Sequence, residues 1–485
     1  MVWVAAQAIP ESITVTELLS DSANSTARPI AAHGIRRAPG ADRAEGPQAA
    51  PEGREEPAKR ATSVTRKQCF QGASIREDAR RERRSERATL RRAAQKLPTP
   101  DEYAAEEGDT VEVARAIERL RKCGRCAIGA VASVTLTPDG VAGTRGVETC
   151  GRALVCAECG ARIREARRGH LLDLIEAAQK QGLGVYFVTL TLRHYQGHSL
   201  AQSLGVIRNA WRMLARGRAW QDQKKGFGLS MVSAVEITTG SRGWHPHLHL
   251  VLFQGTPEVR RTDGEWVRTG VRVPRWTEEQ AEDFRVWLGE RWLSVVEGSG
   301  MPAADERYSM DWREAYSPGD AAGLADYLAK DQGTAEAAAR LRAAALSAEV
   351  TRGDLKTKQR ADHATVPVFS LLADAVEGDA AAWRKWSEYE ETIRGLRWWR
   401  VSHGLAEALG LMSDNRTDEE IAAEVEARGV SVLIVPARDW WRLATAGRVP
   451  DLLTLVEVSG VEVARDWLWS VGYVSGLPQA QAPPG

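Results

Sequence analysis

A short histidine run is the most concentrated set of chemically active side chains in the chain. His245, His247 and His249 stand in the sequence GWHPHLHLVLF and supply three of the nine histidines within five positions. Alternate residues of a β-strand share one face, so the three imidazoles would project together while the intervening leucines enter a core. Neutral imidazoles are common ligands of divalent metal ions. We therefore predict a metal site on this strand.

Glu236 is the candidate third ligand. It lies in the apolar run SAVEIT, which is followed by a glycine-rich turn at 240–243 and then by the histidines. A hairpin at this turn would bring the carboxylate beside the imidazoles, and hard divalent ions that bind phosphate prefer oxygen donors. The predicted metal ligands are thus His247, His249 and Glu236.

A tyrosine and a lysine further along the chain could complete a reactive site. Tyr327 and Lys330 occur in LADYLAKD, and residues three apart on a helix lie on one face. A phenol beside an ammonium group and a metal-bound phosphate is an activated nucleophile with a counter-charge for the transition state. We predict that Tyr327 attacks phosphorus and that Lys330 assists it.

The cysteines indicate a second metal site, of a structural kind. Five of the six fall in one short stretch, as two Cys-x-x-Cys pairs about 30 residues apart with one cysteine between them. This spacing suits a tetrahedral zinc ion in a reducing compartment. The predicted ligands are Cys123, Cys126, Cys156 and Cys159, with Cys150 as the alternative. The helix that follows is basic, and we expect arginines here and after the next strand to contact nucleic-acid phosphates: Arg162, Arg164, Arg167, Arg168 and Arg193.

The elements that must position these residues alternate between strands and helices. β-branched and apolar runs predict strands at about 184–192, 229–237, 247–253, 308–312 and 429–435. Periodic segments between them predict helices at about 161–180, 200–215, 277–297 and 318–331. A hairpin in the middle of such a series indicates an α+β fold on an antiparallel sheet. The tryptophan pairs at 398–399 and 440–441 are expected to be core residues.

Composition divides the chain into four predicted segments. Residues 1–105 form an Arg- and Ala-rich arm, expected to be mostly disordered apart from a basic helix at about 80–96. A cysteine-rich zinc module spans 106–180, the histidine-bearing domain 181–335 and a mainly helical region 336–485. The formal net charge is +0, but 162–225 holds 12 Lys/Arg against 4 Asp/Glu, which suits a polyanion-binding core. We find no membrane span or secretory signal and expect a cytoplasmic protein.

The motifs together resemble those of the HUH endonuclease superfamily, most closely the replication initiators of rolling-circle plasmids from Streptomyces and related actinobacteria. The first motif of that family resembles FVTLTLRH at 187–194, the second His247 and His249, and the third Tyr327 with Lys330. Their order and spacing match, and the resemblance covers roughly residues 120–470.

The resemblance implies a function. Members build a nickase domain on a five-stranded antiparallel sheet with flanking helices, bind Mg²⁺ or Mn²⁺, and cleave one strand of origin DNA through a covalent 5′-phosphotyrosine. It implies plasmid origin DNA, a host helicase and a DNA polymerase as partners, and places His245 outside the ligand pair, next to a ligand or a phosphate. Some relatives carry a glutamate four residues before the tyrosine for the terminating cleavage, where this chain has Gly323.

Three alternatives remain open on the sequence. A conjugative relaxase or a single-strand transposase would use the same chemistry. A histidine-triad nucleotide hydrolase also has histidines alternating with apolar residues, and there one histidine is itself the nucleophile. A zinc-bearing DNA-binding protein without catalytic activity would bind DNA and leave it intact.

Overall fold

The computed structural model describes residues 64–96, 111–193, 195–270, 273–299, 301, 306–314, 359–360, 363–366, 368–424 and 429–473. The described residues from Thr65 onward belong to one compact unit. The predicted reactive pair, Tyr327 and Lys330, and Gly323 lie outside the described residues, as do residues 1–63 and 97–105 of the N-terminal arm. Within the described residues, no helix is both long enough and apolar enough to cross a bilayer.

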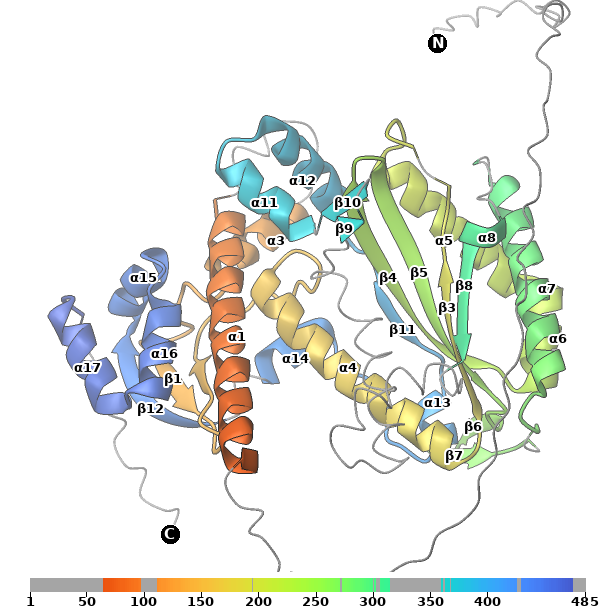
Figure 1. The fold of residues 1–485 in the computed structure, drawn as a ribbon, viewed down its shortest axis with the longest axis horizontal. Helices are drawn as coiled ribbons and strands as arrows, with labels where there is room; N and C mark the ends of the chain where they lie inside the picture. The colour runs from red at the N-terminus through yellow and green to blue at the C-terminus, as the bar shows by residue number, and fades with distance from the viewer. Residues whose placement is uncertain are drawn as a thin grey trace, which may run out of the picture. The chain divides into compact units, whose positions relative to one another are not determined.

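An antiparallel sheet carries the histidine run (Figure 1). Its strand order is β8-β3-β5-β4-β10-β9, and β11 also pairs with β4. The strands are β3 (Gly184–Leu190), β4 (Ser230–Gly240), β5 (Gly243–Gln254), β8 (Met310–Glu314), β9 (Gln359–Arg360), β10 (His363–Val366) and β11 (Trp399–Val401). Because β10 and β11 pair with different parts of β4, they share the fifth position across the sheet. The expected five positions are therefore present, although seven strands fill and extend them.

The hairpin β4–β5 is longer and tighter than the sequence predicts. Its register runs without a break from Ser230↔Phe253 to Gly240↔Gly243, so only Ser241 and Arg242 form the turn, and both strands extend beyond those predicted at 229–237 and 247–253. Gly243 has φ +95°, and an added Cβ there would lie 3.1 Å from the carbonyl oxygen of Tyr195. Glycine is suited to this turn because it adopts positive φ without a side-chain clash.

Both faces of this sheet are buried, by different helices. Leu248, Leu250 and Leu252 belong to one core, packed against α5 (Leu200–Arg216), α6 (Arg218–Phe227) and α7 (Glu278–Glu297). Val251 and Phe253, which continue the histidine face, belong to another core with α4 (Ala157–Lys180), α11 (Val368–Val376) and α12 (Ala380–Thr392). The prediction that the leucines and histidines point to opposite faces is confirmed.

A second, three-stranded sheet joins segments from the two ends of the described chain. Its order is β12-β1-β2, with β1 (Val131–Leu136), β2 (Ala142–Arg145) and β12 (Val430–Pro436). It packs with α15 (Ala437–Thr445), α16 (Val449–Val458) and α17 (Val461–Ser470) around a separate core. Since β1 comes from the predicted zinc module and β12 from the predicted C-terminal region, this sheet crosses the predicted segment boundaries. The pairing of β11 with β4 crosses one as well.

The predicted basic helix at 80–96 lies within α1 (Val64–Ala94). Its arginines do not all face solvent, because Arg80, Arg81 and Arg84 surround the buried carboxylate of Glu457 in α16. The remaining elements are α3 (Val111–Lys122), β6 (Val259–Thr262), β7 (Glu265–Arg268), α8 (Glu306–Ser309), α13 (Leu405–Ala408) and α14 (Asp418–Glu424). This part of the predicted arm is thus integrated into the fold.

Candidate metal centre and cysteine cluster

Glu236, His247 and His249 converge on one face of the β4–β5 hairpin. Glu236 and His247 are directly opposite in the register, and His249 lies opposite Ala234 on the same face. His249 Nε2 is 2.6 Å from Glu236 Oε2, and His247 Nδ1 is 4.0 Å from the same oxygen. One donor atom from each residue lies within 4.8 Å of the others. The structure thus brings the three predicted ligands together.

The environment of this trio is buried on one side and open on the other. The side chains of His249 and Glu236 are 3% and 6% exposed, whereas His247 is 28% exposed. Two imidazole nitrogens and a carboxylate oxygen form a donor set that suits borderline and hard divalent ions such as Mn²⁺. An ion held here would be accessible from the His247 side, where a phosphate oxygen could reach it.

Thr189 supports His249 from the neighbouring strand, and sequence reasoning did not single it out. The two residues are paired in the β3–β5 register, and Thr189 Oγ1 is 3.1 Å from His249 Nδ1. When Nε2 of a histidine binds a metal, Nδ1 carries a proton and donates a hydrogen bond, which the threonine hydroxyl oxygen can accept. Phe187 stacks on the His249 ring at 5.5 Å between centroids. In the sequence, the signal for Thr189 and Phe187 was their place on the strand predicted at 184–192.

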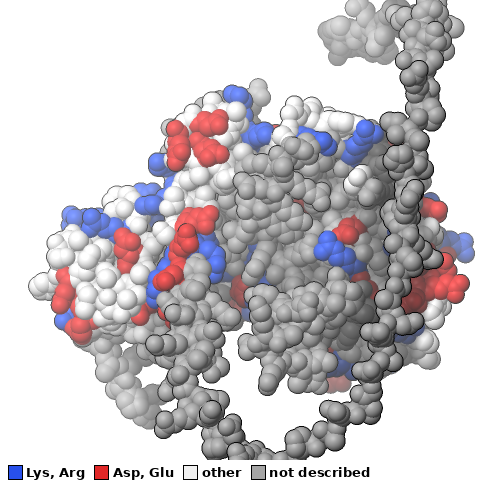
Figure 2. All heavy atoms as spheres, in the orientation of Figure 1, with Lys and Arg blue, Asp and Glu red and all other residues white. Residues whose placement is uncertain are grey.

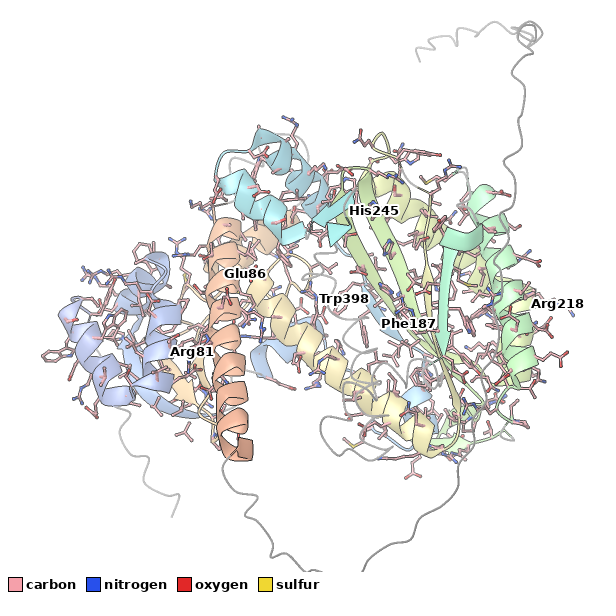
Figure 3. All side chains as sticks on the ribbon, viewed as in Figure 1. Arg81, Glu86, Phe187, Arg218, His245 and Trp398 are labelled. Carbon is pink, nitrogen blue, oxygen red and sulfur yellow. The ribbon has the colours of Figure 1, made fainter. Side chains whose placement is uncertain are left out.

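His245 shares the face but lies outside the ligand group. Its ring centroid is 6.3 Å from that of His247, towards the hairpin turn. Figure 3 labels His245 on β5 and Phe187 on β3. This placement agrees with a role next to the ligand set.

The edge strand β8 adds charge beside the same face. Asp311 pairs with Thr189 and Arg313 with Phe187 in the register, and the two side chains form an ion pair at 2.6 Å. The Arg313 guanidinium also lies over the Phe187 ring, 6.0 Å from its centroid. Arg193, predicted to contact nucleic acid, is exposed just beyond the end of β3 and lies over the ring of Tyr195.

Four cysteine thiols form a second group, and its membership differs from the predicted set. The Sγ atoms of Cys123 and Cys159 are 3.5 Å apart, those of Cys123 and Cys156 are 3.7 Å apart, and those of Cys150 and Cys159 are 3.7 Å apart. All four residues are buried. Zn–S bonds of about 2.3 Å in a tetrahedron place sulfur atoms about 3.8 Å apart, so these distances suit a zinc ion.

Cys150 takes the place predicted for Cys126. The backbone of Cys126 exchanges hydrogen bonds with Lys122 and Glu148, and an isolated bridge joins Ala127 to Val147. This bridge holds the half-buried Cys126 outside the group and brings the segment that carries Cys150 back towards it. The alternative ligand of the sequence analysis is therefore the one that the fold supports, because long-range pairing overrides the Cys-x-x-Cys spacing.

The thiols perturb one another electrostatically. Hydrogen bonds, first from Cys123 and then from Cys150 and Cys156, lower the pKa of Cys159 well below its ordinary value. Hydrogen bonding with Cys123 raises the pKa of Cys150 and Cys156. Cys156 is the N-cap of α4 and Cys159 lies in its first turn, where the helix dipole favours negative charge. Cys159 is thus the thiol of the group that most favours the thiolate, the form that binds metal.

The arginines of α4 are occupied within the fold. Arg164 is buried and donates to the carbonyl oxygen of Ala153 at 2.8 Å, and the buried Arg167 pairs with Asp418 at 3.2 Å. Arg162 pairs with Glu158, and Arg168 with Glu165. Arg164 and Arg167 are thus buried, whereas Arg162 and Arg168 are partly exposed, and the contact with nucleic-acid phosphates stays a prediction for these residues.

The predicted core role of the tryptophans is confirmed at one position of each pair. Trp398, labelled in Figure 3, is 6% exposed and donates to Asp418. Trp440 is fully buried and donates to the carbonyl oxygen of Gly124. Trp441 is 44% exposed and lies beneath the guanidinium of Arg125.

The chain is similar to a protein of Streptomyces lividans named Protein rep. The two are 26% identical over 362 residues, which represent 64% of this chain and 75% of that protein. No family model matches the chain, and no solved structure matches it. The similarity therefore supports a Rep-type replication protein.

Proposed function

We propose that this chain is a replication initiator of the rolling-circle type, which nicks and rejoins one strand of plasmid origin DNA. The similarity to Protein rep favours replication as the process. The observation that carries the chemistry is the convergence of Glu236, His247 and His249 on one sheet face. The proposed strand transfer follows the motif order of the HUH resemblance.

In this proposal His247, His249 and Glu236 hold Mg²⁺ or Mn²⁺, which supplies Lewis acidity towards a phosphodiester. Thr189 Oγ1 would accept a hydrogen bond from His249 Nδ1–H, which would leave the Nε2 nitrogen available to the ion. The hydroxyl of Tyr327 attacks the phosphorus, the bond between phosphorus and O3′ breaks, and the phenolic proton passes to the leaving oxygen. Lys330 places positive charge beside the phosphate, and rejoining is the reverse of this sequence.

The cysteine group is proposed to hold structural Zn²⁺ through Cys123, Cys150, Cys156 and Cys159. It lies at the start of α4, the helix that packs beneath the histidine face of the sheet. A metal here would stabilise that support rather than take part in cleavage, because four protein ligands leave no open position.

The position of Glu236 favours this function over a histidine nucleophile. A histidine that attacks phosphorus needs an accessible ring nitrogen, which the buried His249 lacks, since its Nε2 lies 2.6 Å from Glu236. His247 is more exposed, but its Nδ1 lies 4.0 Å from the same carboxylate oxygen. A carboxylate between two imidazoles instead matches the needs of a cation. A requirement of nicking for a divalent metal ion would distinguish metal-dependent attack by a tyrosine from attack by a histidine.

The test is covalent adduct formation on labelled single-stranded DNA that contains the origin of the host plasmid, with Mn²⁺ present. We expect the wild-type chain to form a protein–DNA adduct and Tyr327→Phe to form none while still binding the DNA. Tyr308→Phe is the matched control, since Tyr308 is exposed and its carbonyl oxygen accepts from Thr191 at the end of β3. An adduct that persists in Tyr327→Phe would refute the assignment of the nucleophile.

A further inference from the structure

An arginine-lined cavity of about 550 Å³ lies between α5 and the segment that leads into β11. Its floor includes Ser233 and Val235 of β4 and Leu248 of β5. These residues alternate with Ala234, Glu236, His247 and His249, so the cavity opens on the opposite face of the sheet from the metal centre. It is therefore a separate surface.

Five exposed arginines surround this cavity, which we call the arginine groove. Three come from α5 and two from the segment before and within β11: Arg208, Arg212, Arg216, Arg397 and Arg400. Within the described part of the chain, no aspartate or glutamate lines it and none of the five arginines forms an ion pair. The groove thus concentrates positive charge that the described part of the fold does not neutralise.

Other arginine-rich cavities differ in this respect. The cavity of about 840 Å³ beside the cysteine group includes Arg152 and Arg167, which pair with Glu390 at 2.8 Å and with Asp418 at 3.2 Å. The cavity of about 290 Å³ under α1 is lined by Arg80 and Arg84, which pair with Glu457. On the face drawn in Figure 2, basic and acidic side chains are also interspersed. The arginine groove is distinguished by its lack of carboxylates.

The geometry of α5 suits a linear polyanion. Residues 208, 212 and 216 are spaced by four, so their side chains form one stripe that spans about 12 Å of helix axis. That length corresponds to about 3–4 nucleotides of one strand of a duplex at 3.4 Å each. Guanidinium groups bind phosphate oxygens through two parallel hydrogen bonds.

We propose that the arginine groove binds the phosphate backbone of duplex DNA, on the sheet face opposite the nicking site. The inference rests on the proposed function only in taking DNA as the polyanion. The aromatic residues favour a duplex over a single strand. Trp398 is buried, and Trp211 is half-buried with its ring packed edge-on against Trp220 at 5.3 Å, so neither presents a free ring for base stacking.

The test uses the zinc-loaded full-length chain without added Mg²⁺ or Mn²⁺, with a labelled duplex of origin-flanking sequence and with a single strand of the same length. Binding is followed by fluorescence anisotropy over a range of salt concentrations. The variant replaces Arg208, Arg212 and Arg216 by Gln. The charge-matched control replaces three exposed arginines of α1, α7 and α15 by Gln: Arg83, Arg291 and Arg438.

We expect the groove variant to bind the duplex about tenfold or more weakly. The slope of log affinity against log salt concentration should become less negative by about 2.7, because each of the three lost phosphate contacts contributes about 0.9. The control should keep most of the affinity and slope. A second variant, Arg397→Gln with Arg400→Gln, should weaken duplex binding independently of any effect on α5. Unchanged duplex binding in both groove variants, or a loss equal to that of the control, would overturn the proposal.

The single-strand arm and a nicking assay separate this inference from the proposed function. Weaker binding of the duplex with unchanged binding of the single strand supports the groove, and a similar loss for both would overturn its assignment to duplex DNA. Groove-dependent duplex binding by a wild-type chain that never forms the covalent adduct would refute the proposed function alone. Nicking by a chain whose groove variants bind the duplex normally would refute the groove alone.

Discussion

Replacing Thr189 by Val tests whether the strand next to the histidines tunes the metal centre. Valine has nearly the shape of threonine and a high β propensity, so β3 should keep its packing. The change removes the hydroxyl that lies 3.1 Å from His249 Nδ1 in a buried position. A metal bound at Nε2 requires the proton on Nδ1, and in the variant that N–H has no acceptor at this place.

The expected loss follows from that contact. Leaving a buried donor without its partner costs about 1–3 kcal/mol. Partners that orient a metal-binding histidine typically contribute 10–100-fold to metal affinity or activity, equivalent to about 1.4–2.7 kcal/mol. We therefore expect Thr189→Val to need roughly 10–100 times more Mn²⁺ for half-maximal nicking.

The assay is the Mn²⁺ dependence of nicking, with Thr189→Ser as the rescue variant because it keeps the hydroxyl. Thr239→Val is the matched control, since Thr239 is buried on β4, donates to the carbonyl oxygen of Gly243 and lies on the opposite face from Glu236. A Thr189→Val enzyme with wild-type Mn²⁺ dependence, or one that Thr189→Ser fails to rescue, would refute the positioning role.

Two further predictions concern the zinc content of the thiol group and the acid stability of the fold. Cys150→Ser should lower the zinc content of the purified protein, measured by elemental analysis, whereas Cys126→Ser should leave it unchanged; the reverse result would restore the predicted ligand set. At Glu457, burial raises the pKa, but the hydrogen bonds and charge of Arg84, with the Ala142 amide and Arg80, outweigh it, so the pKa of the folded state is lowered. The resulting stability is present above the unfolded carboxyl pKa of about 4.3 and is lost as pH falls through the folded value. In urea unfolding at pH 7, Glu457→Gln should therefore have a lower midpoint than the wild-type chain. Between pH 7 and pH 3 the midpoint of the variant should fall less than that of the wild-type chain. Equal falls in the two proteins would contradict this.

Local patterns were sufficient to predict that Glu236, His247 and His249 lie together. Strand alternation placed His247 and His249 on one face, and the turn near Gly240 placed Glu236 opposite them, because all three residues belong to one hairpin. Hairpin register depends on neighbouring residues alone. The predicted α+β class and antiparallel pairing followed from the same local signals.

The sequence did not predict the features that depend on long-range pairing. The pairing of β1 with β12 and of β4 with β11 joins segments that composition had separated. The contribution of Cys150 to the thiol group depends on the bridge between Ala127 and Val147. The burial of Arg164 and Arg167 depends on contacts outside their own helix. A list of basic residues does not distinguish these from exposed ones such as Arg212.

The central claim is that Glu236, His247 and His249 bind a divalent cation, and Mn²⁺ titration of the zinc-loaded full-length chain, followed by the EPR signal of free Mn²⁺, tests it most directly. We predict one tight Mn²⁺ site in the wild-type chain and in Tyr327→Phe, and the loss of this site in His249→Ala and Glu236→Gln. His403→Ala is the control and should retain the site, because it removes an exposed histidine that packs against Trp266. Equal Mn²⁺ affinity in the wild-type chain and in His249→Ala would contradict the account.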